Sequence, residues 1–203
     1  MYPTTFNTET DLSAVNSILG SIGQAPVQSL TFENPEVSFV YNLLMEVSTD
    51  VQTEGWAFNT EWNYPLTPDS NKNIVIPENI LQMDVNEMQE VNTYDVVRRD
   101  GKLYNRRDHT FEWDKKMNVD IVWRFEFNDL PVAFKRYITY RAAGRAAAQL
   151  VTNPQLVQLL ATQEGQARAA CMEYECNQGD YSYFGTPAGV KYRSFKPYQS
   201  LAR

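Results

Sequence analysis

The chain has 203 residues, of which 43% are hydrophobic and 21% are charged, and its formal net charge is -7. These proportions exclude a largely disordered chain, and the length suffices for one well-buried core with or without a small insertion. The acidic balance argues against general nucleic-acid binding, which needs a basic surface, but is compatible with an acidic channel that repels duplex DNA. The N-terminus has no apolar run, and no window reaches the roughly 18 apolar residues of a membrane span. We therefore expect a soluble protein, made in a cytoplasm, with no membrane anchor.

Four segments show apolar residues at helical spacing. They span residues 10–22, 35–54, 130–151 and 154–178. The first two end at glycines, Gly23 and Gly55, while a proline stands at the first helical position of the last three. We expect a bundle of four main helices with a shared core. The side chains predicted to be buried in it are Val40, Leu44, Val47, Phe134, Ile138, Leu156, Leu160 and Cys171.

The middle of the chain changes to prolines and short runs of β-branched and aromatic residues. Asp100-Gly101 is a strong turn signal and predicts a hairpin of residues 95–99 and 102–105. The further strands that we expect are residues 73–76 and 80–85, and a final hairpin of residues 109–113 and 117–127. The predicted fold class is α+β. It combines a helical bundle (1–61 and 128–180), an inserted antiparallel β-sheet (62–127) and an extended C-terminal tail or arm (181–203).

The C-terminal segment 181–203 is rich in aromatic and basic residues and has no acid. Its four cations leave a charge of -11 on residues 1–180. We expect an arm that docks on a neighbour or partner, because aromatic and arginine side chains dominate interfaces; a tail folded back on its own bundle is the alternative. Glycine within the third helix suggests a close helix contact. The candidate interface residues are Gly144, Tyr181, Tyr183, Phe184, Lys191, Tyr192, Arg193, Phe195, Lys196 and Tyr198.

We find no catalytic, metal-binding or cofactor-binding motif in the sequence. The sole histidine, His109, has no second histidine or nearby cysteine, and Cys171 and Cys176 are spaced for different helix faces, so we expect free thiols. The acids Asp84, Glu87, Glu90 and Asp95 lack the spacing of a calcium loop. We predict no catalytic, metal or cofactor residues and no enzymatic activity. A glycan-degrading enzyme that uses unidentified carboxylates is the alternative.

Four stretches resemble the tail tubular protein A family, the head-to-tail adaptor of T7-like short-tailed phages. They are Asp11-Leu12-Ser13-Ala14-Val15-Asn16 with Ile18-Leu19 and Ser21-Ile22-Gly23; Gly55-Trp56-Ala57-Phe58-Asn59; Leu130-Pro131 with Phe134 and Ile138; and Ala167-Arg168 with Cys171-Met172-Glu173-Tyr174. Their order and spacing agree with that family from the N-terminus to the final Leu201-Ala202-Arg203.

The resemblance implies a non-enzymatic structural protein of the virion tail, placed at the head–tail junction after assembly in the host cytoplasm. It implies a closed ring of about twelve copies of the chain. The implied partners are the portal protein above, the tail nozzle (tail tubular protein B) below, and tail fibres. DNA passes through the lumen without specific binding. A head-completion or stopper protein of another phage type is a further alternative.

Overall fold

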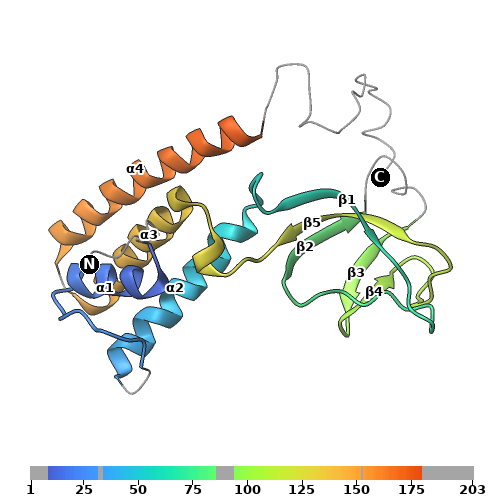
Figure 1. Ribbon diagram of the computed structural model, residues 1–203, viewed down its shortest axis with the longest axis horizontal. Coiled ribbons are helices and arrows are strands. Elements are labelled where there is room, and N and C mark those ends of the chain that lie inside the picture. The colour runs from blue at the N-terminus through green and yellow to red at the C-terminus, as the bar shows by residue number, and fades with distance from the viewer. Residues whose placement is uncertain (1–8, 32–33, 86–93, 152, 180–203) are drawn as a thin grey trace, which may run out of the picture. The chain divides into compact units, whose positions relative to one another are not determined.

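The computed structural model describes residues 9–31, 34–85, 94–151 and 153–179 (Figure 1). Contacts divide the chain into two compact units. Of the described residues, 9–54 and 125–177 belong to the first unit, and 55–124 with 178–179 belong to the second. The chain passes from the first unit to the second after Glu54 and returns to the first at Phe125. The predicted arm, residues 181–203, lies outside the described residues.

The first unit holds all four predicted helices, each ending within two residues of its expected limits. They are α1 (Asp11–Ser21), α2 (Pro35–Thr53), α3 (Val132–Leu150) and α4 (Pro154–Gln178), with a short 3-10 turn at Phe127–Asp129 before α3. The second unit contains an antiparallel sheet, so the predicted α+β fold class is confirmed (Figure 1). None of the helices in the described ranges is both long and apolar enough to cross a membrane.

Side-chain caps explain where these helices start. Thr10 and Ser13 form a capping box, in which each side chain accepts a hydrogen bond from the other residue's backbone N–H. Asn34 caps α2 through the N–H of Glu36 at 2.9 Å, and Asn153 caps α4. At the other end of α1, Gly23 has φ +81°, which places it at the left-handed position of a Schellman motif.

The core of the first unit lies where α3 packs against α1 and α2. Seven of the eight side chains predicted to be buried are buried, and Leu156 is half-buried. Leu156 lies in the first turn of α4, where Pro154, Gln155 and Gln158 are exposed, so little of the bundle reaches this end of the helix. The fully enclosed side chains are Val15, Ile18, Val40, Leu44, Val47, Val51, Phe134, Ile138, Ala142, Ala146 and Ala147.

The second unit is built on a three-stranded antiparallel sheet in the order β1-β5-β2. Its strands are β1 (Thr60–Leu66), β2 (Ile80–Val85) and β5 (Met117–Trp123), and a separate hairpin joins β3 (Val96–Arg99) to β4 (Lys102–Asn105). Asp100 and Gly101 both have positive φ at the hairpin turn, as a two-residue turn of this kind requires. The buried cluster of this unit is Leu66, Ile74, Ile76, Ile80, Val85, Val96, Leu103, Trp113, Met117, Val119 and Ile121.

Two predicted strands and one predicted hairpin were wrong, and one strand was missed. Residues 109–113 form no strand, because His109 takes φ +54° in a turn and only Thr110 makes an isolated bridge, to Asn105. The final strand β5 therefore pairs with β1 and β2 instead of closing a local hairpin. Residues 73–76 contribute only an isolated bridge at Val75. Strand β1 was not predicted, since Pro65 and a bulge at Asn63 interrupt its pattern.

Candidate assembly surface

Opposite charges hold the helices of the first unit together. The first 54 residues of the chain contain seven acids and neither lysine nor arginine. The arginines of this unit lie on α3 and α4 and pair with those acids, whereas the buried Lys135 of α3 donates to the Asn128 carbonyl at 2.7 Å. Arg145 of α3 contacts Asp50 at 2.8 Å and Glu46 at 3.4 Å on α2, and Arg136 pairs with Glu9 just before α1. The N-terminal helices and α3, which are distant in sequence, are thus matched in charge.

A polar cluster attaches α4 to the rest of the bundle; it consists of Glu54, Tyr137, Arg141, Glu164 and Arg168. Arg168 of α4 donates two hydrogen bonds to the Glu54 carboxylate, at 2.9 and 3.2 Å, and one to the Tyr137 hydroxyl at 2.8 Å. Arg141 of α3 donates to the same hydroxyl at 2.9 Å. The hydrogen bonds to Glu54 and then Tyr137 raise the pKa of Arg168. The bidentate pair ties α4 to Glu54 at the end of α2, and the bond to the Tyr137 hydroxyl ties it to α3.

Apolar contacts between α4 and the bundle are few. Within the described residues of α4, the buried side chains are Leu160, Cys171 and Glu175. Tyr174 adds an edge-to-face contact with Phe134 of α3, with ring centroids 5.7 Å apart. The inner stripe predicted for this helix is therefore present, but it is narrow, and most of the surface of α4 is exposed.

The exposed side of α4 consists mainly of uncharged residues and carries one acid. We define the outward face of α4 by its exposed residues Gln155, Gln158, Leu159, Thr162, Gln166, Ala169, Met172 and Glu173. Leu159 is 57% exposed and Met172 is 46% exposed. Two exposed residues of the helix are charged: Arg168, which Glu54 engages, and Glu173, which lies on the same side of the helix as Gln166 and Ala169.

A groove of about 310 Å³ runs between α1 and α3. Ser13 and Ser17 of α1 line it, together with Thr139 and Tyr140 of α3, and the Glu9–Arg136 ion pair borders it. Tyr140 is 37% exposed, so the groove offers hydroxyl groups together with part of an aromatic ring. It is a second open surface on the first unit.

Gly144, the predicted interface residue that the structure describes, lies half-buried on α3. A Cβ added there would lie 3.9 Å from Glu164 Oε2 of α4, which is an ordinary van der Waals distance. Packing within the subunit thus leaves room for alanine, and a contact with another subunit stays a prediction. The other predicted interface residues, from Tyr181 to Tyr198, lie outside the described ranges.

The residues considered as catalytic or metal-binding candidates do not gather at one site. His109 is exposed in a turn, with Nδ1 3.4 Å from the Tyr104 hydroxyl. Cys171 is buried and Cys176 is exposed, and both are free thiols. Glu87 and Glu90 of the acidic cluster fall outside the described residues. Across residues 9–31, 34–85, 94–151 and 153–179, no three histidine, cysteine or acidic side chains gather into a possible metal site.

The two thiols are expected to react at different rates. Burial raises the pKa of Cys171 to about 12, whereas Cys176 is exposed. Since the thiolate is the reactive form, a maleimide or disulfide reagent at neutral pH should label Cys176 rapidly and Cys171 only after unfolding. Counting labelled thiols by mass spectrometry checks this. Rapid labelling of both thiols in the folded protein would contradict the burial of Cys171.

The raised pKa of Cys171 also has a consequence for stability. The unfolded thiol ionises near pH 9, where the folded one still holds its proton, so the native state binds more protons at alkaline pH. The contribution of this group to stability is therefore complete below about pH 9 and is lost as the pH rises toward 12. A Cys171→Ala variant should show a smaller alkaline loss of stability than the wild type in urea unfolding series.

The fold defines a class: an α+β protein with a helical bundle, an antiparallel sheet inserted in the sequence between two pairs of helices, and a last helix that is largely exposed. The family model of tail tubular proteins matches residues 12–181, and the chain belongs to that family. It is a structural protein of the phage tail. A search among curated proteins finds no match.

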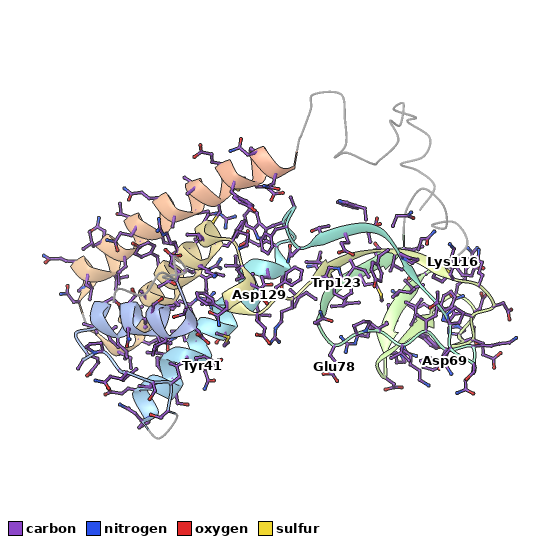
Figure 2. All side chains as sticks on the ribbon, in the orientation of Figure 1. Tyr41, Asp69, Glu78, Lys116, Trp123 and Asp129 are labelled. Carbon is purple, nitrogen blue, oxygen red and sulfur yellow. The ribbon has the colours of Figure 1, made fainter. Side chains whose placement is uncertain are left out.

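The outward face of α4 was not predicted from the sequence. Its signal was present as a run of glutamine, alanine and leucine with few charges, between Asn153 and Arg168. The residues predicted to be buried on this helix, among them Leu160 and Cys171, lie on its inner side. Figure 2 shows the side chains of the described residues as sticks, with Tyr41 of α2 labelled.

Proposed function

We propose that the protein is the head-to-tail adaptor of a short-tailed phage. In this role, copies of the chain form a closed ring of about twelve subunits between the portal at the capsid vertex and the tail nozzle. The ring forms part of the channel through which DNA passes without specific binding. The family match over residues 12–181 carries this proposal, because it spans both the bundle and the sheet.

The stretches that resemble tail tubular protein A occupy structural positions in both units. Asn59, the last residue of the Gly-Trp-x-Phe-Asn stretch, accepts a hydrogen bond from the Trp56 N–H at 2.8 Å and donates one to the Trp123 carbonyl at 2.9 Å. Trp123 lies at the end of β5 (Figure 2). Gly55 opens this stretch with φ +75°. The motif thus organises the entry into the second unit.

The other stretches contribute to the bundle. Leu130, Phe134 and Ile138 are buried in the first unit, and Arg168 anchors α4 through the polar cluster. These residues stabilise the fold of the subunit, which supports a structural, non-enzymatic role for the protein. The proposed adaptor is located in the virion at the head–tail junction, with the portal, nozzle and tail fibres as partners. We further propose that residues 181–203 and Gly144 take part in contacts between subunits or with the portal.

Mass measurement of the purified protein, alone and mixed with the cognate portal ring, tests this proposal. An adaptor should form a ring by itself or be recruited onto the portal in a fixed number of copies. A protein that stays monomeric in both samples and does not bind the portal would contradict the adaptor role. Turnover of a capsule glycan by that monomer would point instead to an enzyme.

A further inference from the structure

We propose that the basic face of the β3–β4 hairpin docks on residues 125–132 in the first unit of a second copy of this chain, and that this contact repeats around the ring. The inference rests on the proposed ring and adds to it the two surfaces that meet. We define the basic face by Arg99 and Lys102 together with Val75, whose backbone bridges to Lys102.

The β3–β4 hairpin and the turn after it are basic, although the chain as a whole is acidic. Residues 98–107 contain five cations and one acid, Asp100, whereas the formal net charge of the chain is -7. Among the described residues, Arg98, Arg99 and Lys102 form no ion pair with an acid. The charge of these three side chains is therefore not neutralised by the part of the chain that the structure describes.

The strand register places two of these cations side by side. Arg99 of β3 and Lys102 of β4 are direct partners across the hairpin, and directly opposed side chains lie on the same face of a sheet. Arg99 also contacts an aromatic ring, since its guanidinium carbon lies 4.1 Å from the centroid of the Tyr104 ring. Like charges that are directly opposed destabilise a sheet, so a partner that supplies acids to this face relieves their repulsion.

An apolar side chain in the same row indicates that the partner is a protein. Val75 is 61% exposed and forms an antiparallel bridge with Lys102, so it lies on the basic face beside the two cations. A nucleic acid would bring phosphates to the cations, but its charged backbone gives little cover to an exposed valine. The net charge of -7 on the chain also repels a polyanion.

The first unit of a second copy supplies the complementary charge. Its described residues include eleven acids and five cations. Every copy carries both this acidic unit and a basic hairpin, so the hairpin of one copy attracts the first unit of the next. A contact between two unlike surfaces is heterologous, and repeating it around an axis closes a ring.

Residues 125–132 combine acids with exposed apolar side chains. Glu126 and Asp129 are exposed, and neither forms an ion pair within the described residues. Phe125 is 36% exposed and Val132 is 50% exposed. The segment therefore offers acids to the two cations of the basic face and apolar surface to its valine.

The surroundings of this segment leave it acidic. Asp11 adds a third acid, since its N–H donates to Asn128 Oδ1 at 3.1 Å. The exposed cations close in sequence are Arg124 and Arg136, and an acid of the same subunit engages Arg136. Lys135 is buried and donates to the Asn128 carbonyl. The three acids therefore outnumber Arg124 by two, which matches the two cations of the basic face.

Charge reversal tests which surfaces meet. Arg99→Glu/Lys102→Glu makes the basic face acidic, and Glu126→Lys/Asp129→Lys makes the opposing segment basic. Each variant alone should form at least about tenfold less ring on the cognate portal than the wild type, since like charges then meet at every contact. An equal mixture of the two variants should restore the ring, because copies that alternate around it place a reversed hairpin against a reversed segment. Mass measurement of the portal-bound protein counts the copies.

The matched control is Lys115→Glu/Lys116→Glu, which makes the same change in charge on exposed residues of the second unit. It should form rings as the wild type does, and circular dichroism checks that every variant folds. Normal ring formation by either reversed variant, or an equal loss in the control, would overturn the proposal. A mixture of folded variants that forms no ring would also overturn it and would direct the hairpin to the portal or to DNA. Absence of a ring from the wild type would reject the adaptor function as well.

Discussion

Replacing Leu44 by alanine is expected to lower the free energy of unfolding by about 2–5 kcal/mol. Leu44 lies on α2 and is fully buried in the first unit, so its removal takes apolar surface out of the core and leaves a cavity. The cost is high because Leu44 belongs to a closely packed core where α2 meets α3, and such a core collapses only partly into a new cavity. Urea unfolding followed by the far-ultraviolet signal of the helices measures it.

Leu159→Ala is the matched control for this substitution. It removes the same atoms from a side chain that is 57% exposed, and should change the free energy of unfolding by less than about 0.5 kcal/mol. Equal losses in the two variants would mean that α2 does not pack in the bundle as described.

Replacing Gln52 by alanine should lower the free energy of unfolding by about 2–4 kcal/mol. The Gln52 side chain is 1% exposed and pairs with the backbone of Phe125, where the chain returns to the first unit. Its Oε1 accepts the Phe125 N–H at 2.7 Å and its Nε2 donates to the Phe125 carbonyl at 3.1 Å. Alanine leaves both backbone groups without these bonds, as well as a small cavity.

Hydrogen exchange gives this second prediction a local readout. The Phe125 amide should exchange faster in Gln52→Ala than in the wild type, because its acceptor is gone. Gln158→Ala, on the exposed side of α4, is the control and should alter neither stability nor exchange. Unchanged exchange at Phe125 in the Gln52 variant would show that this hydrogen bond is not formed in solution.

The helices were predictable because their signals are local. Apolar spacing, the caps Thr10, Asn34 and Asn153, and the terminal glycine Gly23 act within one or two turns of the chain, and the structure has helices with nearly the predicted ends. The β3–β4 hairpin was predictable for the same reason, since Asp100-Gly101 specifies its turn.

The rest of the sheet depends on pairings between distant residues. Strand β5 pairs with β1 and β2, which are far from it in sequence, and no local signal distinguishes these partners from the hairpin that we predicted. Strand β1 was also missed because Pro65 and the bulge at Asn63 break the alternation of apolar and polar residues that identifies a strand. The order of the strands in the sheet is therefore set by tertiary contacts, which the local sequence pattern does not specify.

The candidate surface was only partly predictable. The sequence pointed to Gly144 because it is a glycine within a helix, and to the arm because of its composition. The exposure of α4, by contrast, depends on how α2 and α3 are arranged beside it. The polar cluster joins Glu54 to Arg168, which are 114 residues apart, and no spacing rule links them. The resemblance to tail tubular proteins came from short stretches, and the family match covers residues 12–181 of the chain.

Electron microscopy of the purified protein with and without its portal ring tests the central claim most directly. The adaptor role predicts an added ring of density, with a fixed number of copies of this chain, on one end of the portal and around a continuous channel. Portal particles that look the same in the presence and absence of the protein would contradict that role.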